Sequence, residues 1–332
     1  MNNTCTARST SARSTSARST FVSSRLLVVA ALVVLFTTTV FASSTPAATF
    51  DRTLTVSGPV DLEVLTHSGD VTVRAGASGS VTIHGKVFMS DRWNILPGVG
   101  VGGNRDSAQA VAQNPPIRQE GNSVHIDYVE VKNISVDYEI TVPADTTIRS
   151  HSGSGDQLVE GTHGNVDVTT GSGDVKLTHL TGEVTLQTGS GDVRAREISG
   201  PVKGGTGSGD VEIEETGSGD VYLHTGSGNI IARGVQGGFR GETGSGDVTA
   251  EGTQSGSWEI HTGSGNVHVQ LPSNAAFDAD ISTSSGTVDV DSPIEMTVQG
   301  RVGDTHKQIR GKVRGGGPLL RVHTGSGDIH IA

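Results

Sequence analysis

The sequence has 332 residues, including 47 Gly, 7 Phe, 3 Tyr, 2 Trp and one Cys, and its formal net charge is −11. Few aromatic residues and many glycines argue against a compact helical enzyme, and a single Cys argues against a disulfide-linked scaffold. Residues 1–42 contain four Arg and no acidic residue, so the remaining chain carries a net charge of −15. That charge argues against nucleic acid as a partner, because phosphate binding needs clustered basic side chains.

The N-terminal segment has the features of an export signal. Three near-copies of Ala-Arg-Ser-Thr-Ser precede an unbroken apolar run from Leu26 to Phe36. Eleven apolar residues suit a signal-peptide core and fall short of the roughly 20 that span a bilayer. The small residues at Val40 and Ala42 predict cleavage after Ala42, and a retained anchor formed by residues 26–42 is the alternative. Either way, we expect an exported protein of the periplasm or cell surface.

A short repeat dominates the chain from residue 151 to residue 270. Gly, a polar residue and an apolar residue recur from Asp156 to Asn266 in twelve steps with a mean length of about nine residues. Apolar residues alternate with polar ones inside each unit, as in Val175 and Leu177, and each unit ends in a turn of the Thr-Gly-Ser-Gly type. This alternation predicts strands with one buried face, and no helices are expected in the body of the protein.

The polar position of the repeat distinguishes a β-solenoid from an antiparallel meander. Every second unit carries Asp or Asn, whereas the alternate units are varied. The regular set is Asp156, Asp174, Asp192, Asp210, Asn229, Asp247 and Asn266. A true repeat of about 18 residues explains this alternation. The sequence therefore predicts an all-β, single-stranded β-solenoid (β-helix) with two strands per coil, whose stacked coils place the column at steps of about 4.8 Å.

The domain organisation follows from this rhythm. Residues 1–42 form the signal peptide or anchor, residues 43–49 a short linker, and residues 50–332 one solenoid domain. Residues 89–116 interrupt the rhythm as a long loop insertion, expected to be mobile or to contact a partner. Lys307, Arg310, Lys312 and Arg314 lie in a basic stretch that reads as a solvated strand pair. The unit Gly327-Asp328-Ile329 is expected to form the last coil.

The chain resembles the bacterial "putative adhesin" family of β-strand repeats, a domain of unknown function. The resemblance covers roughly residues 50–332. It depends on the strand Asp137–Pro143, the repeated Thr-Gly-Ser-Gly-Asp-Val units, and the closing Gly-Gly-Gly-Pro-Leu that precedes Thr324–Ile329. It implies an exported β-solenoid, often at the cell surface or membrane-associated, and it brings no catalytic residues.

Calcium is the cofactor to consider, because nonapeptide β-rolls bind it. In this chain the Asp directly follows the second Gly of the turn, one position earlier than the β-roll motif requires, so that specific site is excluded. A structural role in the turn is the first interpretation of the Asp column, and no cofactor is predicted. Weak Ca²⁺ binding is the alternative. The candidate residues for it are Asp156, Asp174, Asp192, Asp210 and Asp247.

Histidine and aromatic residues are the further candidates for metal binding and catalysis. His224, His261 and His323 each precede Thr-Gly-Ser-Gly, but they do not converge in sequence as zinc ligands do, so exposed positions are expected and no metal site is predicted. Tyr222 is the one aromatic residue of the main array that alternation places outward, whereas Phe239 and Trp258 fall inward. A glycoside-cleaving site would need paired carboxylates and aromatic platforms, so catalysis is not expected.

The leading hypothesis is a non-catalytic, exported solenoid that presents a repetitive polar face to a glycan or an envelope protein. A membrane contact is expected only through an uncleaved N-terminal segment. The alternative is a self-associating structural protein, because residues 328–332 would leave an unpaired strand edge at the end of the solenoid. A polysaccharide-active β-helix enzyme is the third hypothesis.

Overall fold

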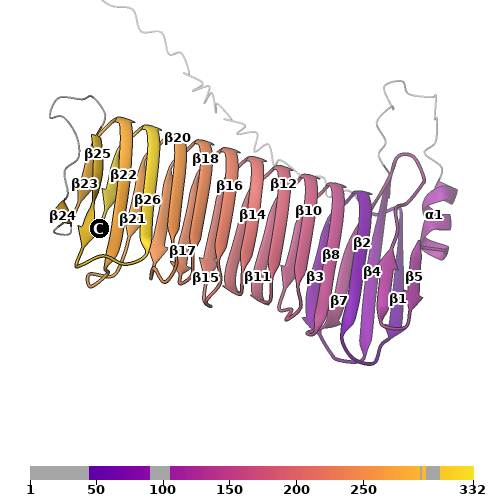
Figure 1. Cartoon of the computed structure of the whole chain (residues 1–332). Helices are drawn as coiled ribbons and strands as arrows, with labels where there is room; N and C mark the ends of the chain where they lie inside the picture. The colour runs from indigo at the N-terminus through magenta and orange to yellow at the C-terminus, as the bar shows by residue number, and fades with distance from the viewer. Residues whose placement is uncertain (1–44, 90–104, 292–293, 297–306) are drawn as a thin grey trace, which may run out of the picture. The chain divides into compact units, whose positions relative to one another are not determined.

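The computed structural model describes residues 45–89, 105–291, 294–296 and 307–332, all within the compact unit Ser44–Ala332 (Figure 1). The predicted signal peptide or anchor lies outside the described residues. Two long sheets face each other. Sheet A has 13 strands, in the spatial order β1 (Ala48–Thr55), β4 (Ser80–Met89), β7 (Ile134–Pro143), β3 (Val71–Gly76), β9 (Gln157–Glu160), β11 (Val175–Thr181), β13 (Val193–Ser199), β15 (Val211–Glu215), β17 (Ile230–Val235), β19 (Val248–Gly252), β21 (Val267–Gln270), β27 (Ile329–Ile331) and β23 (Val288–Val290).

Sheet B has 14 strands and supplies the other half of each coil. Their spatial order is β24 (Ile294–Met296), β25 (Lys307–Val313), β22 (Phe277–Ser285), β26 (Leu319–Ser326), β20 (Trp258–Ser264), β18 (Phe239–Ser245), β16 (Val221–Ser227), β14 (Val202–Ser208), β12 (Val184–Ser190), β10 (Val166–Ser172), β8 (Thr146–Ser154), β2 (Val60–Ser68), β6 (Ser123–Ile126) and β5 (Ile117–Glu120).

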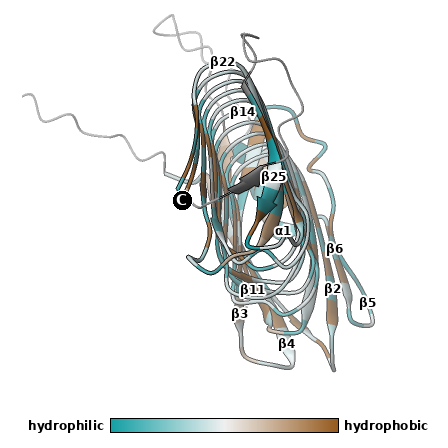
Figure 2. Ribbon diagram, turned by 60° about the vertical axis from the view of Figure 1, so that its left-hand side comes forward, coloured by the Kyte–Doolittle hydropathy of each residue, from teal (hydrophilic) through white to brown (hydrophobic). Residues whose placement is uncertain are grey.

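From β8 to β21 the chain alternates between the sheets, and neighbouring strands within each sheet run parallel. The bonds between successive coils join residues 18 or 19 positions apart. Figure 2 looks along the stack, where successive coils overlap. The predicted all-β solenoid with two strands per coil is confirmed.

The core lies between the two sheets and is built by the period-two alternation. In β12, Val184, Leu186 and Thr188 are buried, while the residues between them are partly or fully exposed. Phe239 and Trp258 point inward with 2% and 0% exposure, and their ring centroids lie 5.6 Å apart. Tyr222 lies on the outer face, so the alternation places all three aromatic residues correctly.

The Thr and Gly residues of the repeated turn hold one coil on the next. The buried Thr188 donates its hydroxyl hydrogen to the carbonyl of Gly173 in the preceding coil, and Thr206 does the same to Gly191, both at 3.0 Å. Gly191 has φ +145°, and a Cβ atom there would collide with the carbonyl oxygen of Gly173. Only glycine combines this positive φ with the lack of a Cβ atom, which explains why glycine recurs at this position in each coil.

The N-terminal end departs from simple coiling. β1, β4 and β7 pair antiparallel, and β5 pairs antiparallel with β6. The predicted solenoid domain of residues 50–332 therefore begins with antiparallel strands, because alternation specifies a buried face and not a strand direction.

One helix, α1 (Arg105–Gln113), packs against β1 and β4 and buries Ala108, Val111 and Ala112 (Figure 1). It corrects the expectation of a body without helices, and it lies in the predicted loop insertion, whose residues 90–104 are outside the described part. The buried residues are three and four positions apart, which is the helical spacing that the sequence prediction overlooked. None of the described helical residues forms a span with the length and hydrophobicity that crossing a membrane requires.

The C-terminal end also differs from the prediction. Strands β26 and β27 enter between β20 and β22 and between β21 and β23, so the last coil in sequence is not the last in space. Residues 329–331 pair on both sides, and the proposed free edge at residues 328–332 is wrong. The basic stretch forms β25, antiparallel to β22, with Arg310 bonded to Asp280 at 3.0 Å, as expected of a solvated strand pair.

Candidate functional site

The predicted Asp column forms a continuous hydrogen-bonded ladder along one turn edge. Oδ1 of each member accepts the backbone N–H of the equivalent residue in the next coil. The distances are 2.9 Å for Asp156, 2.9 Å for Asp174, 3.0 Å for Asp192, 2.7 Å for Asp210 and 2.7 Å for Asp247. Asn229 and Asn266 continue the ladder at 2.9 Å each. One oxygen of every candidate carboxylate is therefore engaged with the backbone.

The ladder extends beyond the main repeat at both ends. Asp137 accepts the N–H of Asp70, which in turn accepts that of Asp156. At the other end Asp328 accepts both the N–H and the hydroxyl of Thr287, each at 2.7 Å. Sequence reasoning missed this continuity because the order in space is not the order in sequence.

The second carboxylate oxygen of the ladder faces outward. At Asp192 it accepts a bond from Arg194 at 2.7 Å, and the same guanidinium lies 3.9 Å from Oδ2 of Asp174. The ladder geometry accounts for the Asp residues as turn-stabilising groups. Weak Ca²⁺ binding along the column stays a prediction.

The outer face of sheet B holds a row of polar side chains. Strand register places His224 beside Glu242, Glu242 beside His261, and His261 beside His323. These four residues line an open groove of about 560 Å³ together with the adjoining Thr and Gly residues of β16, β18, β20 and β26. The coil repeat itself places His224, Glu242 and His261 in one row, and the insertion of β26 beside β20 adds His323.

A second row on the same face lies two residues earlier along each strand. Arg240 lies 5.6 Å above the ring of Tyr222 and is bonded to Glu242. Arg321 contacts Glu259 at 3.2 Å. The acidic groups beside the groove are therefore paired with arginines, which leaves hydroxyl, imidazole and aromatic groups for contact with a ligand.

His224 closes one end of the groove. Its ring lies over Gly205 of β14, where any Cβ atom would collide with it, and it is tilted against Tyr222 with ring centroids 5.8 Å apart. A glycine at this register position therefore makes room for the imidazole.

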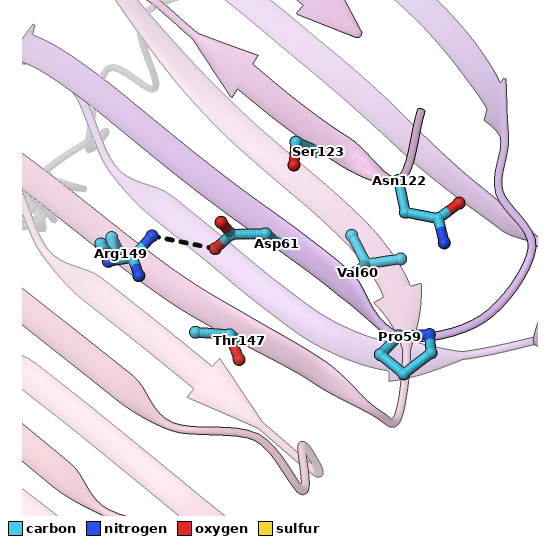
Figure 3. Close-up of a pocket in the computed structure, with 7 residues that line it drawn as sticks. All are labelled: Pro59, Val60, Asp61, Asn122, Ser123, Thr147 and Arg149. Carbon is cyan, nitrogen blue, oxygen red and sulfur yellow. Dashed lines mark hydrogen bonds and ion pairs between the residues drawn. The ribbon is translucent and has the colours of Figure 1, made fainter. Parts of the chain in front are cut away.

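A smaller hollow of about 310 Å³ lies near the N-terminal end, between β2, β6 and β8 (Figure 3). Asp61 and Arg149 lie on its floor and form an ion pair at 3.0 Å, with Asn122 and Ser123 on the other side. Because its two charged groups neutralise each other, this hollow is a weaker candidate than the groove.

Glu215 is a buried carboxyl group at the opposite turn edge, away from the groove. Its Oε1 accepts the N–H of Gly219 at 2.9 Å, and Oε2 has no partner among the described residues. Burial raises the pKa of Glu215 to about 7, against the effect of backbone hydrogen bonds from Gly219 and Gln236. This group affects stability rather than ligand contact.

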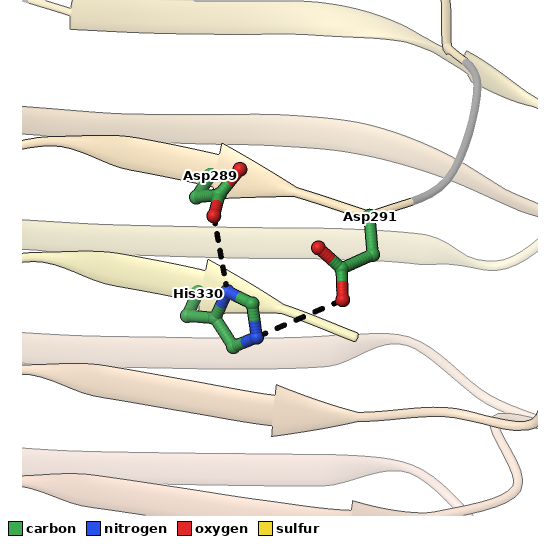
Figure 4. A group of neighbouring side chains, drawn as sticks. All are labelled: Asp289, Asp291 and His330. Atoms are coloured by element: carbon green, nitrogen blue, oxygen red, sulfur yellow. Dashed lines mark ion pairs between the residues drawn. The ribbon is translucent and has the colours of Figure 1, made fainter.

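The ends of β23 and β27 bring together Asp289, Asp291 and His330 (Figure 4). Sequence reasoning did not bring these residues together, because β23 and β27 are far apart in the chain and become neighbours only through the C-terminal insertion.

The two facing parallel sheets, the stacked coils and the turn ladder define a β-solenoid with an exposed polar face. The family model described as Toastrack DUF4097 matches residues 61–332, and the chain belongs to this family. The resemblance noted from the sequence is therefore confirmed. A comparison with curated proteins gives no match.

Two solved structures are similar over most of the chain. One is a "putative adhesin" from Bacteroides fragilis, with 13% identity and a TM-score of 0.36, covering 86% of this chain and 97% of that chain. The other is a "putative cell adhesion protein" from Clostridium sporogenes, with 12% identity and a TM-score of 0.23, covering 86% of this chain and 99% of that chain. At these scores neither likeness carries an argument about function.

Proposed function

We propose that this protein is a non-catalytic binding module of the cell envelope that holds a linear glycan on the outer face of sheet B. The observation that carries the proposal is the row of His224, Glu242, His261 and His323, which lie in register on four neighbouring strands and line one groove.

The arrangement suits an extended polymer. Neighbouring strands lie about 4.8 Å apart, so the four side chains span roughly 14 Å in a straight line. Imidazole groups can exchange hydrogen bonds with sugar hydroxyls, and the half-buried Tyr222 lies beside His224 at one end.

Charge favours an uncharged polymer over a polyanion. The chain after residue 42 has a net charge of −15, and Arg240 and Arg321 are already paired with Glu242 and Glu259. A nucleic acid or a strongly acidic polysaccharide would therefore find little free positive charge on this face.

We also propose export to the periplasm or cell surface. The support is the basic lead, the apolar run Leu26–Phe36 and the small residues before the expected cleavage point after Ala42. Mass spectrometry of the protein recovered from cells tests this, because a mature chain that starts at Ser43 would establish both export and cleavage.

The binding proposal is tested with an array of glycans and cell-wall polymers, followed by titration of any polymer that binds. The double variant His261→Ala/His323→Ala should weaken binding at least about tenfold. The matched control is His151→Ala, because His151 occupies the same row of sheet B on β8, four strands from His224, and is exposed. Equal losses in both variants, or no binding of any polymer, would contradict the proposal.

The other hypotheses have separate readouts in the same experiment. Release of shortened products from a bound polymer would contradict a non-catalytic role. The self-association hypothesis assumed a free strand edge at residues 328–332, but β27 is paired on both sides. Light scattering of the purified chain measures its oligomeric state, and we expect a monomer.

A further inference from the structure

We propose that Asp289, Asp291 and His330 form a site for a borderline transition-metal dication, with Zn²⁺ as the ion to test. The site lies on the outer face of sheet A, away from the groove of sheet B, and is independent of the proposed function.

The positions of the three residues follow from strand register. His330 of β27 lies directly opposite Asp289 of β23, and the backbone N–H of Asp291 bonds to the carbonyl of Ile331 at 2.9 Å. Asp289 and Asp291 are two residues apart at the end of a strand, so both side chains point to the same face as the imidazole. Figure 4 shows the ring between the two carboxylates.

The two ring nitrogens of His330 face different carboxylates, so a shared ion would take one of these nitrogens and require the other Asp side chain to turn toward it. Nδ1 of His330 lies 3.6 Å from Oδ2 of Asp289, and Nε2 lies 3.9 Å from Oδ2 of Asp291. Both exceed the usual hydrogen-bond length. Two ligands at about 2.1 Å from a tetrahedral ion lie about 3.4 Å apart. Each of the three residues offers one ligand atom, and these atoms all lie within 4.8 Å of one another.

A fourth residue restrains the ring. His268 of β21 stacks on His330 with ring centroids 5.1 Å apart and an angle of 15° between the planes. The rung His268, His330, Asp289 therefore places the imidazole between a parallel ring and a carboxylate. Such orientation of a ligand by a neighbouring group lowers the cost of binding.

The donor set specifies the class of metal. One imidazole nitrogen and two carboxylate oxygens suit Zn²⁺ with a water as the fourth ligand, whereas Ca²⁺ and Mg²⁺ prefer oxygen ligands alone. The two carboxylates repel each other until a cation binds between them. An ion would also link β27 to β23, the edge strand of sheet A among the described residues.

Calorimetric titration of the full chain with ZnCl₂, in parallel with CaCl₂, tests the site. His330→Gln should remove one Zn²⁺ per chain or weaken it at least about tenfold, and Asp289→Asn should do the same. His323→Gln is the matched control, because His323 lies in the strand before His330 on the opposite sheet.

A second readout is the hydrogen exchange of β23, which Zn²⁺ should slow in the wild-type chain and leave unchanged in His330→Gln. Equal Zn²⁺ stoichiometry and affinity in the wild type and in His330→Gln would overturn the site. A response to Ca²⁺ but not to Zn²⁺ would overturn the assignment of the metal. Glycan binding should be unaffected by His330→Gln and Asp289→Asn, which lie outside the groove, so the two proposals fail separately.

Discussion

The Asp ladder predicts that an amide can replace a carboxylate and that a methyl group cannot. Asp210 accepts the backbone N–H of Asn229 at 2.7 Å, and Asn229 accepts that of Asp247 at 2.9 Å in the same geometry. Asp210→Asn keeps the accepting oxygen, so the free energy of unfolding should change by less than about 0.5 kcal/mol.

Asp210→Ala removes the acceptor. A hydrogen bond to a charged group contributes about 1.5–3 kcal/mol, and because the turn edge is exposed, water replaces part of it. We expect a loss of about 1–2 kcal/mol in equilibrium denaturation with urea. Asp167→Ala is the control, because Asp167 is an exposed carboxylate on the outer face of β10 away from the turn, and its loss should be near zero.

The three variants separate the ladder from a cation column. If Asp210→Asn loses as much stability as Asp210→Ala, the negative charge of Asp210 is needed for stability. The claim that an accepting oxygen alone is enough would then be wrong. A column that binds Ca²⁺ should raise the melting temperature of the wild type when Ca²⁺ is added and should do so less in Asp210→Asn. The absence of a shift at millimolar Ca²⁺ would end the column hypothesis.

Three further predictions concern the buried Glu215 and Tyr138 and two turn glycines. Because the folded chain holds the Glu215 proton up to pH about 7, whereas the ordinary value is 4.5, the free energy of unfolding should fall as pH rises through this window, by about 3 kcal/mol at most. Glu215→Gln should not show this fall in the free energy of unfolding. Parallel pH dependences of the wild type and Glu215→Gln would refute the prediction. The buried Tyr138 hydroxyl has no partner among the described residues, so Tyr138→Phe should leave stability unchanged or raise it by about 1 kcal/mol; a clear loss in urea denaturation would mean that the hydroxyl is bonded. Gly191→Ala should lose more than about 2 kcal/mol, because its Cβ meets a backbone carbonyl, whereas Gly121→Ala, with φ +62° and open space around it, should lose about 1 kcal/mol; similar losses would contradict the packing argument.

The sequence predicted the parts of the fold that repeat. The alternation of Val184 and Leu186 fixed which side chains are buried, and the Asp or Asn at every second unit indicated two strands per coil. These signals are local and recur many times. The repeat therefore remains recognisable despite irregularities such as the longer turn before Asp220.

The parts that do not repeat were beyond the sequence pattern. Helix α1 is a single short element in an insertion, and its apolar spacing at Ala108, Val111 and Ala112 was not recognised. The insertion of β26 and β27 between earlier strands depends on long-range pairing, which no periodicity encodes. The cluster around His330 and the place of His323 in the groove depend on that insertion, so neither could be predicted.

The most direct test of the account is hydroxyl-radical footprinting of the chain with and without a saturating bound polymer. We expect protection of Tyr222, His224, His261 and His323 on the outer face of sheet B, with no change at His268 and His330 on sheet A. Protection along the Asp ladder instead, or protection of sheet A alone, would contradict the claim that the groove is the binding surface.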